Sequence, residues 1–180
     1  MTVPYLHQHY RNSTRILLTD PALQELFLHI LTFHGKATTV VSSEESEETP
    51  EDFAMFSTRQ MEEGALFQPN IVLHSSALSP ESTLLLSSIV GGGVLIFPEK
   101  DSTVLEHMEG ITNFFRKIPY DRPDFEVNGN TLTLHTEIGS VPVPFQDPAV
   151  AENLEGLRLL CQQAGLMEEE FYEALMNFNS

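Results

Sequence analysis

Few residues in this sequence have the types and spacing that chemistry needs, and the first to consider is a Gly-Lys pair. His34-Gly35-Lys36 is followed by Ala37 and two threonines, which is how a phosphate-binding loop ends. Such a loop must lie between a strand and the start of a helix, so that its backbone N–H groups point at the phosphates. Here the tripeptide follows an apolar helical stripe and precedes a β-type run, so it stands at the wrong end of a helix. We predict a helix C-cap in which Gly35 takes the left-handed conformation.

The other candidate groups are equally weak as sites. Gly91-Gly92-Gly93 also follows a helical segment and precedes a strand, which indicates a connection rather than a nucleotide fingerprint. His7-Gln8-His9 offers only two metal ligands, and Cys161 lies on the apolar face of a predicted helix, where a buried inert thiol is the usual case. We therefore assign no catalytic residue, no metal site and no cofactor to this chain.

Length and charge narrow the class of protein. The chain has 180 residues, 41% of them hydrophobic, which suffices for one domain spanning 1–180 with a substantial core. Nine Lys+Arg against 26 Asp+Glu give a formal net charge of −17, so the chain repels nucleic acid and anionic lipid. It has no apolar run of bilayer length and no signal pattern, and its one cysteine requires no oxidising compartment. We expect a cytoplasmic protein that binds neither nucleic acid nor membrane.

Residues 43–52 form the most biased segment. They hold six carboxylates and no basic residue, and such a run cannot bury apolar surface. We predict a mobile surface loop. Cation binding is the alternative, although a flexible run without fixed geometry selects no metal well.

The elements that would position these residues alternate in the first hundred residues. Asp20-Pro21 and Ser79-Pro80 have the cap-then-proline pattern that begins a helix. The apolar stripe of the second helix is expected to contain Leu84, Leu85, Ile89 and Val90. Short β-type runs predict strands at 15–18, 37–41, 53–56, 70–73 and 94–97.

The last third of the chain has a different pattern of predicted elements. Asn128-Gly129 lies between two alternating runs and predicts a β-hairpin over 125–134 with a type I′ turn. The two prolines of Val141–Phe145 allow an edge strand at best. Asp147-Pro148 begins one helix that ends at Gly165, and a last helix covers about Glu168–Asn177. The whole pattern predicts an α/β fold, with a mostly parallel sheet and helices on both faces.

Several segments, in their order, resemble the central, ATP-binding domain of the Mur ligases, and most of all the murein-peptide ligases. The likeness is carried by Thr14–Leu18, Leu26–Leu31, Pro69–Leu73, Gly92–Phe97, Phe115–Tyr120, Glu152–Arg158, Leu160–Gly165 and Phe171–Phe178. The resemblance covers nearly the whole chain and implies a P-loop-NTPase-like sheet. In that family the domain uses ATP and magnesium, and murein-peptide ligases join UDP-N-acetylmuramate to a peptide.

The residues that carry this chemistry in the family are missing here. The family's first strand runs into Gly-x-x-Gly-Lys-Thr-Thr, whereas Thr19-Asp20-Pro21 has no glycine or lysine and places a negative charge where the phosphates would lie. Ala54–Arg59, at the position of the acidic magnesium ligands, has no carboxylate, and Ser75–Ser79 lacks the family's Asp-His pair. Only Asn153 remains of its His-Asn-x-x-Asn motif. Phosphoryl transfer needs such cationic and N–H groups, so we expect neither ATP binding nor ligase activity.

We hypothesise a catalytically inactive, degenerate Mur-ligase-like domain with a binding or regulatory role, whose partner is a protein of cell-wall precursor synthesis or recycling. The alternative is a small-molecule binder or enzyme with a rebuilt site, because open α/β sheets bind ligands at the carboxyl ends of their strands. A fragment of a split ligase completed by another chain is a third interpretation. The residues expected at that rim are Thr19, Asp20, His74, Ser75, Ser76 and Asn153.

Overall fold

The fold is built on a six-stranded parallel sheet. The computed structural model describes residues 6–41, 50–75, 82–100, 106–129, 131–143 and 147–178. Every pairing in the large sheet is parallel, and its order is β2-β3-β1-β4-β5-β6. Its strands are β1 (Thr14–Leu18), β2 (Thr38–Val40), β3 (Phe53–Ser57), β4 (Ile71–Leu73), β5 (Val94–Pro98) and β6 (Arg116–Tyr120).

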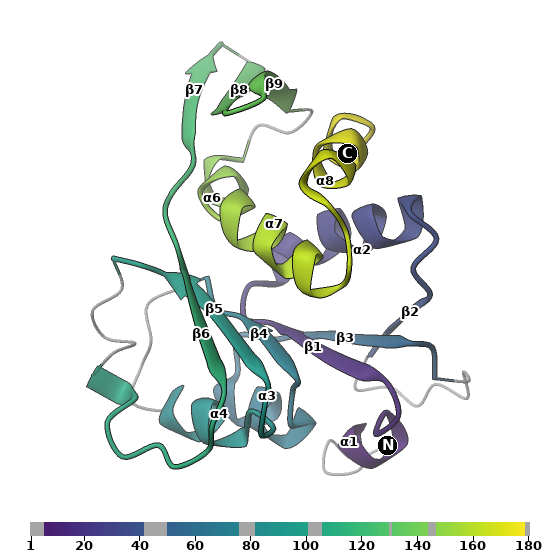
Figure 1. Cartoon of the computed structure of the whole chain (residues 1–180), viewed down its shortest axis with the longest axis vertical. Helices are drawn as coiled ribbons and strands as arrows, with labels where there is room; N and C mark the ends of the chain where they lie inside the picture. Colours follow the sequence, from purple (N-terminus) through teal and green to yellow (C-terminus); the bar gives the residue numbers. More distant parts are fainter. Residues whose placement is uncertain are drawn as a thin grey trace.

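Helices cover both faces of this sheet, as expected (Figure 1). Side chains of a strand point alternately to opposite faces. Ile16 and Leu18 therefore belong to one core cluster, which the long helices complete, whereas Leu17 belongs to a second cluster under the shorter ones. The first face carries α2 (Gln24–Phe33), α7 (Leu154–Gln163) and α8 (Glu168–Met176), and the second carries α3 (Met61–Phe67) and α4 (Ser82–Ser88). Across the described ranges, no helix has the length and apolar character needed to cross a bilayer.

A small antiparallel sheet extends the first face. It has the order β7-β8-β9 and consists of β7 (Asp124–Asn128), β8 (Thr131–Thr136) and β9 (Gly139–Val143). Figure 1 shows it beyond α6 (Pro148–Glu152) and α8, joined to the large sheet by the chain that leaves β6. Its inward side chains, Leu132, Leu134, Val141 and Val143, are buried in the same cluster as α7 and α8. The predicted hairpin and the proline-bearing edge strand β9 are therefore confirmed.

The first strand-to-helix unit follows its sequence signals closely. Asp20 accepts a hydrogen bond from Ala22 N at 3.2 Å, and Pro21 opens a 3-10 turn, η2 (Pro21–Leu23), that leads into α2. Gly35 ends α2 at φ +66°, with its N–H donating to Thr32 O. His34-Gly35-Lys36 is thus a helix C-cap, as its place in the sequence indicates.

Three sequence expectations are wrong in detail. The single helix predicted from Asp147 is two helices, because Asn153 leaves helical geometry between α6 and α7. Asn128 pairs with Thr131, so the hairpin turn begins at Gly129, one residue later than predicted. Leu84 is 53% exposed, because α4 presents Leu85 and Leu86 to the sheet instead. α4 also ends at Ser88, so Ile89 and Val90 lie outside the helix to which they were assigned. α3 and β6 have no clear apolar periodicity, and sequence reasoning did not predict them.

Two expectations lie partly or wholly outside the described residues. The start of the helix at Ser79-Pro80 is one of them, and most of the acidic segment is the other. The end of that segment is anchored, contrary to the expectation of a mobile loop over 43–52. Glu51 N donates to Thr39 Oγ1 at 3.2 Å, and Thr14 N donates to Asp52 O at 2.8 Å.

β6 and α7 pack closely because the α7 residue at their contact is a glycine. Gly156 lies under the ring of Tyr120, and a Cβ placed there would be 2.6 Å from Tyr120 Cε1 and 2.9 Å from Leu73 Cδ1. Both neighbours are buried, so neither can move aside without disturbing the core.

We expect Gly156→Ala to lower the free energy of unfolding by about 1–3 kcal/mol, because the added methyl overpacks this contact. Gly91→Ala is the matched control, since a Cβ at Gly91 meets nothing within 4 Å. Urea unfolding of both variants tests this, and equal stability of the two would show that Tyr120 is free to move.

Candidate functional site

The carboxyl ends of β1 and β4 bring three of the six predicted rim residues together. Thr19 Oγ1 lies 3.4 Å from His74 Nδ1 and accepts a hydrogen bond from Ser75 N at 3.1 Å. Thr19 and His74 are each 1% exposed, so they lie beneath the rim rather than on it. Ser75 is only half-buried and is the member of this group that reaches the surface. Ser76 lies outside the described residues.

Asp20 occupies the first turn of the strand-to-helix connection. Its Oδ1 accepts the Ala22 N–H and also pairs with Arg59 Nη2 at 2.9 Å. Leu23 N donates to Asp20 O, so two of the first N–H groups of this helix are satisfied by Asp20 itself. The Asp20 carboxylate and the hydrogen bonds by which Asp20 caps the helix therefore occupy the position at which the resemblance predicts a phosphate.

Asn153, the last predicted rim residue, is held by Tyr120, the last residue of β6. The Tyr120 hydroxyl donates to Asn153 Oδ1 at 2.6 Å, and Asn153 Nδ2 donates to Ala149 O at 2.9 Å. The side chain is 9% exposed and both of its polar atoms are engaged. The break between α6 and α7 gives Asn153 this position.

A hollow of about 150 Å³ lies at the rim beside Ser75. Ser75, Lys100, Arg122 and Asn153 are among the residues that line it. Lys100 follows β5, Arg122 follows β6, and Arg59 follows β3, so three of the nine basic residues gather at this edge of an acidic chain. Sequence reasoning missed them. The rule that ligands bind after parallel strands could have found Arg59 and Lys100, because both follow strands that were predicted.

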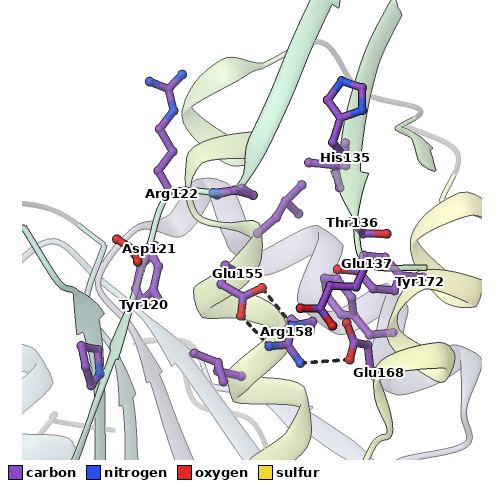
Figure 2. Close-up of a pocket in the computed structure, with 16 residues that line it drawn as sticks. Tyr120, Asp121, Arg122, His135, Thr136, Glu137, Glu155, Arg158, Glu168 and Tyr172 are labelled. Atoms are coloured by element: carbon purple, nitrogen blue, oxygen red, sulfur yellow. Dashed lines mark hydrogen bonds and ion pairs between the residues drawn. The ribbon is translucent and has the colours of Figure 1, made fainter. Parts of the chain in front are cut away.

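A larger pocket of about 490 Å³ lies between the small sheet and the helices α7 and α8. Figure 2 shows its polar centre, where Arg158 projects from α7 between two glutamates. Arg158 Nε donates to Glu155 Oε2 at 2.9 Å, and its Nη2 donates to Glu155 Oε1 at 2.5 Å. The pair with Glu168 at the start of α8 is longer, with Nη1 and Oε2 3.8 Å apart. No sequence motif pointed to this pocket, because its walls come from segments far apart in the chain.

The electrostatics of this pocket are set by burial and by the two glutamates. The hydrogen bonds to Glu155 raise the pKa of Arg158, which therefore stays charged. Burial raises the pKa of the Tyr172 phenol, and the negative charges of Glu155 and Glu168 raise it further. Tyr172 is thus a neutral hydroxyl donor at physiological pH.

The structure also shows the surroundings of the lone cysteine and of the groups that could bind a metal. Cys161 is fully buried on α7, and burial raises the pKa of its thiol, which makes it a poor nucleophile. Within the described ranges, no three His, Cys, Asp or Glu side chains are grouped so that they could hold a metal ion.

The fold of this chain is similar to that of solved structures of Mur ligases and of FolC. MurF from Acinetobacter baumannii superposes with a TM-score of 0.72 at 14% identity, over 99% of this chain and 48% of that one. The murein-peptide ligase MPL from Neisseria meningitides gives 0.71 at 10%, over 99% and 70%. E. coli FolC, solved with ADP, gives 0.62 at 10%, over 99% and 60%. The Mur ligase central-domain fold expected from the sequence is therefore confirmed.

The likeness lies in the fold rather than in the sequence. No protein-family model and no curated protein matches the chain. The chain spans about half the length of the MurF structures that it matches.

We expect Asp20→Ala to destabilise the protein by about 1 kcal/mol, because the N-cap of the η2–α2 segment is lost. Arg59→Ala should change the free energy of unfolding by less than about 0.5 kcal/mol, since its side chain is 75% exposed and such ion pairs are weak. Urea unfolding of the two variants separates the cap from the ion pair. An equal loss in both would contradict the capping role.

The raised pKa of Tyr172 predicts a loss of stability at high pH. Above about pH 10 the phenol ionises in the unfolded chain before it does in the folded one, so the free energy of unfolding falls as pH rises. Tyr172→Phe should remove this part of the slope between pH 9.5 and 11 and leave no ionisation effect at pH 7. Unfolding curves at each pH check this, and identical slopes in both proteins would refute it.

Proposed function

We propose that this chain is a binding domain that has the Mur ligase central-domain fold and lacks the ligase's ATP chemistry. The observation that carries the proposal is the carboxylate of Asp20 at the first helix N-terminus. It accepts the Ala22 N–H that would otherwise be open to a phosphate oxygen. A negative charge at that position repels an anionic ligand, whereas nucleotide-binding loops offer free N–H groups and a lysine.

The size of the rim hollow supports the same conclusion. Its 150 Å³ is below the roughly 300–1,000 Å³ typical of small-molecule sites, so the rim has little room for a nucleoside triphosphate. Lys36 cannot supply the missing cation, because it precedes β2 and so lies at the amino edge of the parallel sheet, opposite the rim.

The biological context that we propose follows from the structural neighbours. Two of them, MurF and the murein-peptide ligase, bear the names of ligases that act on muramoyl peptides and UDP-N-acetylmuramate. We propose a cytoplasmic role in which this domain binds a protein of cell-wall precursor synthesis or recycling, without contacting nucleic acid or membrane. The net charge of −17 supports the last two points.

A second candidate function rests on the hollow at the rim. Lys100 lines it together with Asp121 and the Arg122–Glu152 ion pair, so its lining is balanced in charge. Its volume suits a small polar ligand better than a nucleotide. This favours a small-molecule binder with a rebuilt site, as the alternative to a domain that only binds proteins.

Calorimetric titration with ATP and magnesium at moderate salt tests the proposal. We expect no saturable heat up to about millimolar ATP, while a Mur ligase with its glycine-rich loop binds in the same buffer. The parallel titration is with inorganic phosphate, and binding of phosphate without ATP would favour the second candidate. Saturable ATP binding at micromolar affinity would overturn the proposal.

A further inference from the structure

The 490 Å³ pocket between the small sheet and α7 is a separate place where a ligand could bind. Its volume is in the range of small-molecule sites. Pro123 and Leu159 are its partly exposed apolar lining residues. Leu134, Leu154 and Phe171 lie beneath the wall, each only 1–2% exposed. Four separate segments form it, so its shape is defined by the tertiary structure and not by one loop.

The basic side chains of the pocket are already neutralised by the protein. The Arg158 guanidinium is held in a two-pronged contact by Glu155. Arg122 pairs with Glu152 at 3.2 Å and stacks 4.7 Å from the centre of the Phe125 ring. Figure 2 shows Arg122 directed away from the Arg158 network. An anionic ligand would have to displace these contacts in order to bind.

In contrast, the pocket has more carboxylates than its two arginines neutralise. Glu168 is 3.8 Å from Arg158 Nη1, which is too long for a hydrogen bond, and its side chain is 41% exposed. Asp121 and Glu137 line the same pocket and form no ion pair with any described residue. Tyr172 also lines the pocket, close enough to Glu155 and Glu168 to feel their negative charges.

We propose that this pocket binds an organic cation, an ammonium group carried on an apolar arm. The ammonium group would be held by Glu168, with Glu137 and Tyr172 beside it, and the arm would lie along the partly exposed apolar side chains of the wall, Pro123 and Leu159. This inference goes beyond the proposed function, since it does not depend on whether the rim binds ATP.

Titration of the full chain with 1,5-diaminopentane, followed by amide chemical shifts in NMR, tests this inference. We expect saturable shifts that centre on Thr136, Glu168 and Phe171. The isosteric probes 1,5-pentanediol and glutarate keep the arm and remove or reverse the charge, and neither should bind.

Three variants locate the site. Glu168→Gln should weaken diamine binding about tenfold. This is the lower end of the loss in affinity expected when one charge-assisted hydrogen bond is removed. Glu173→Gln makes the same charge change on an exposed residue of the same helix and should leave the affinity within twofold. Glu137→Lys places a cation in an exposed turn at the pocket mouth and should abolish binding even if Glu168→Gln is poorly folded.

Shifts spread over the whole acidic surface would overturn the inference, because they would show non-specific cation binding. Tighter binding of glutarate, or equal weakening by Glu168→Gln and Glu173→Gln, would do the same. None of these results bears on the ATP titration, so the two proposals fail separately.

Discussion

The contact of Tyr120 with α7 is the constraint on which the rest of the first face depends. Its ring packs over Gly156, and its hydroxyl binds Asn153 at the point where α6 ends and α7 begins. Tyr120 is also the last residue of β6, from which the chain leaves for the small sheet. It borders both the rim hollow and the larger pocket. One buried side chain thus fixes strand, helix break and pocket wall relative to one another.

Charge is distributed unevenly over this acidic molecule. Along the carboxyl edge of the sheet one basic residue follows each of β3, β5 and β6, and two of these, Arg59 and Arg122, pair with the carboxylates of Asp20 and Glu152. At the N-terminus of the first helix, the Asp20 carboxylate occupies the position where a nucleotide-binding fold presents free backbone N–H groups to a phosphate. The edge of the sheet where ligands bind in open α/β folds therefore has a carboxylate at the position where a nucleotide would need positive charge.

Local signals predicted the first half of the fold well. The Asp20-Pro21 cap and Gly35 are short-range features, and each appears as predicted because capping interactions act within a few residues. β6 was missed because its alternation of exposed and buried positions is weak at an edge of the sheet. The break at Asn153 was missed because it is stabilised by Tyr120, 33 residues away.

The sequence by itself determined the α/β class, the parallel sheet and the absence of a phosphate-binding loop after the first strand. These follow from periodicity, capping residues and local charge, which depend on neighbours along the chain. Only the tertiary structure decided that Thr19 and His74 are buried and that Glu155, Arg158 and Glu168 meet beside Tyr172. Such groupings bring together segments separated by many residues. Which side chains face one another is therefore set by how helices and sheets pack, and no local pattern records it.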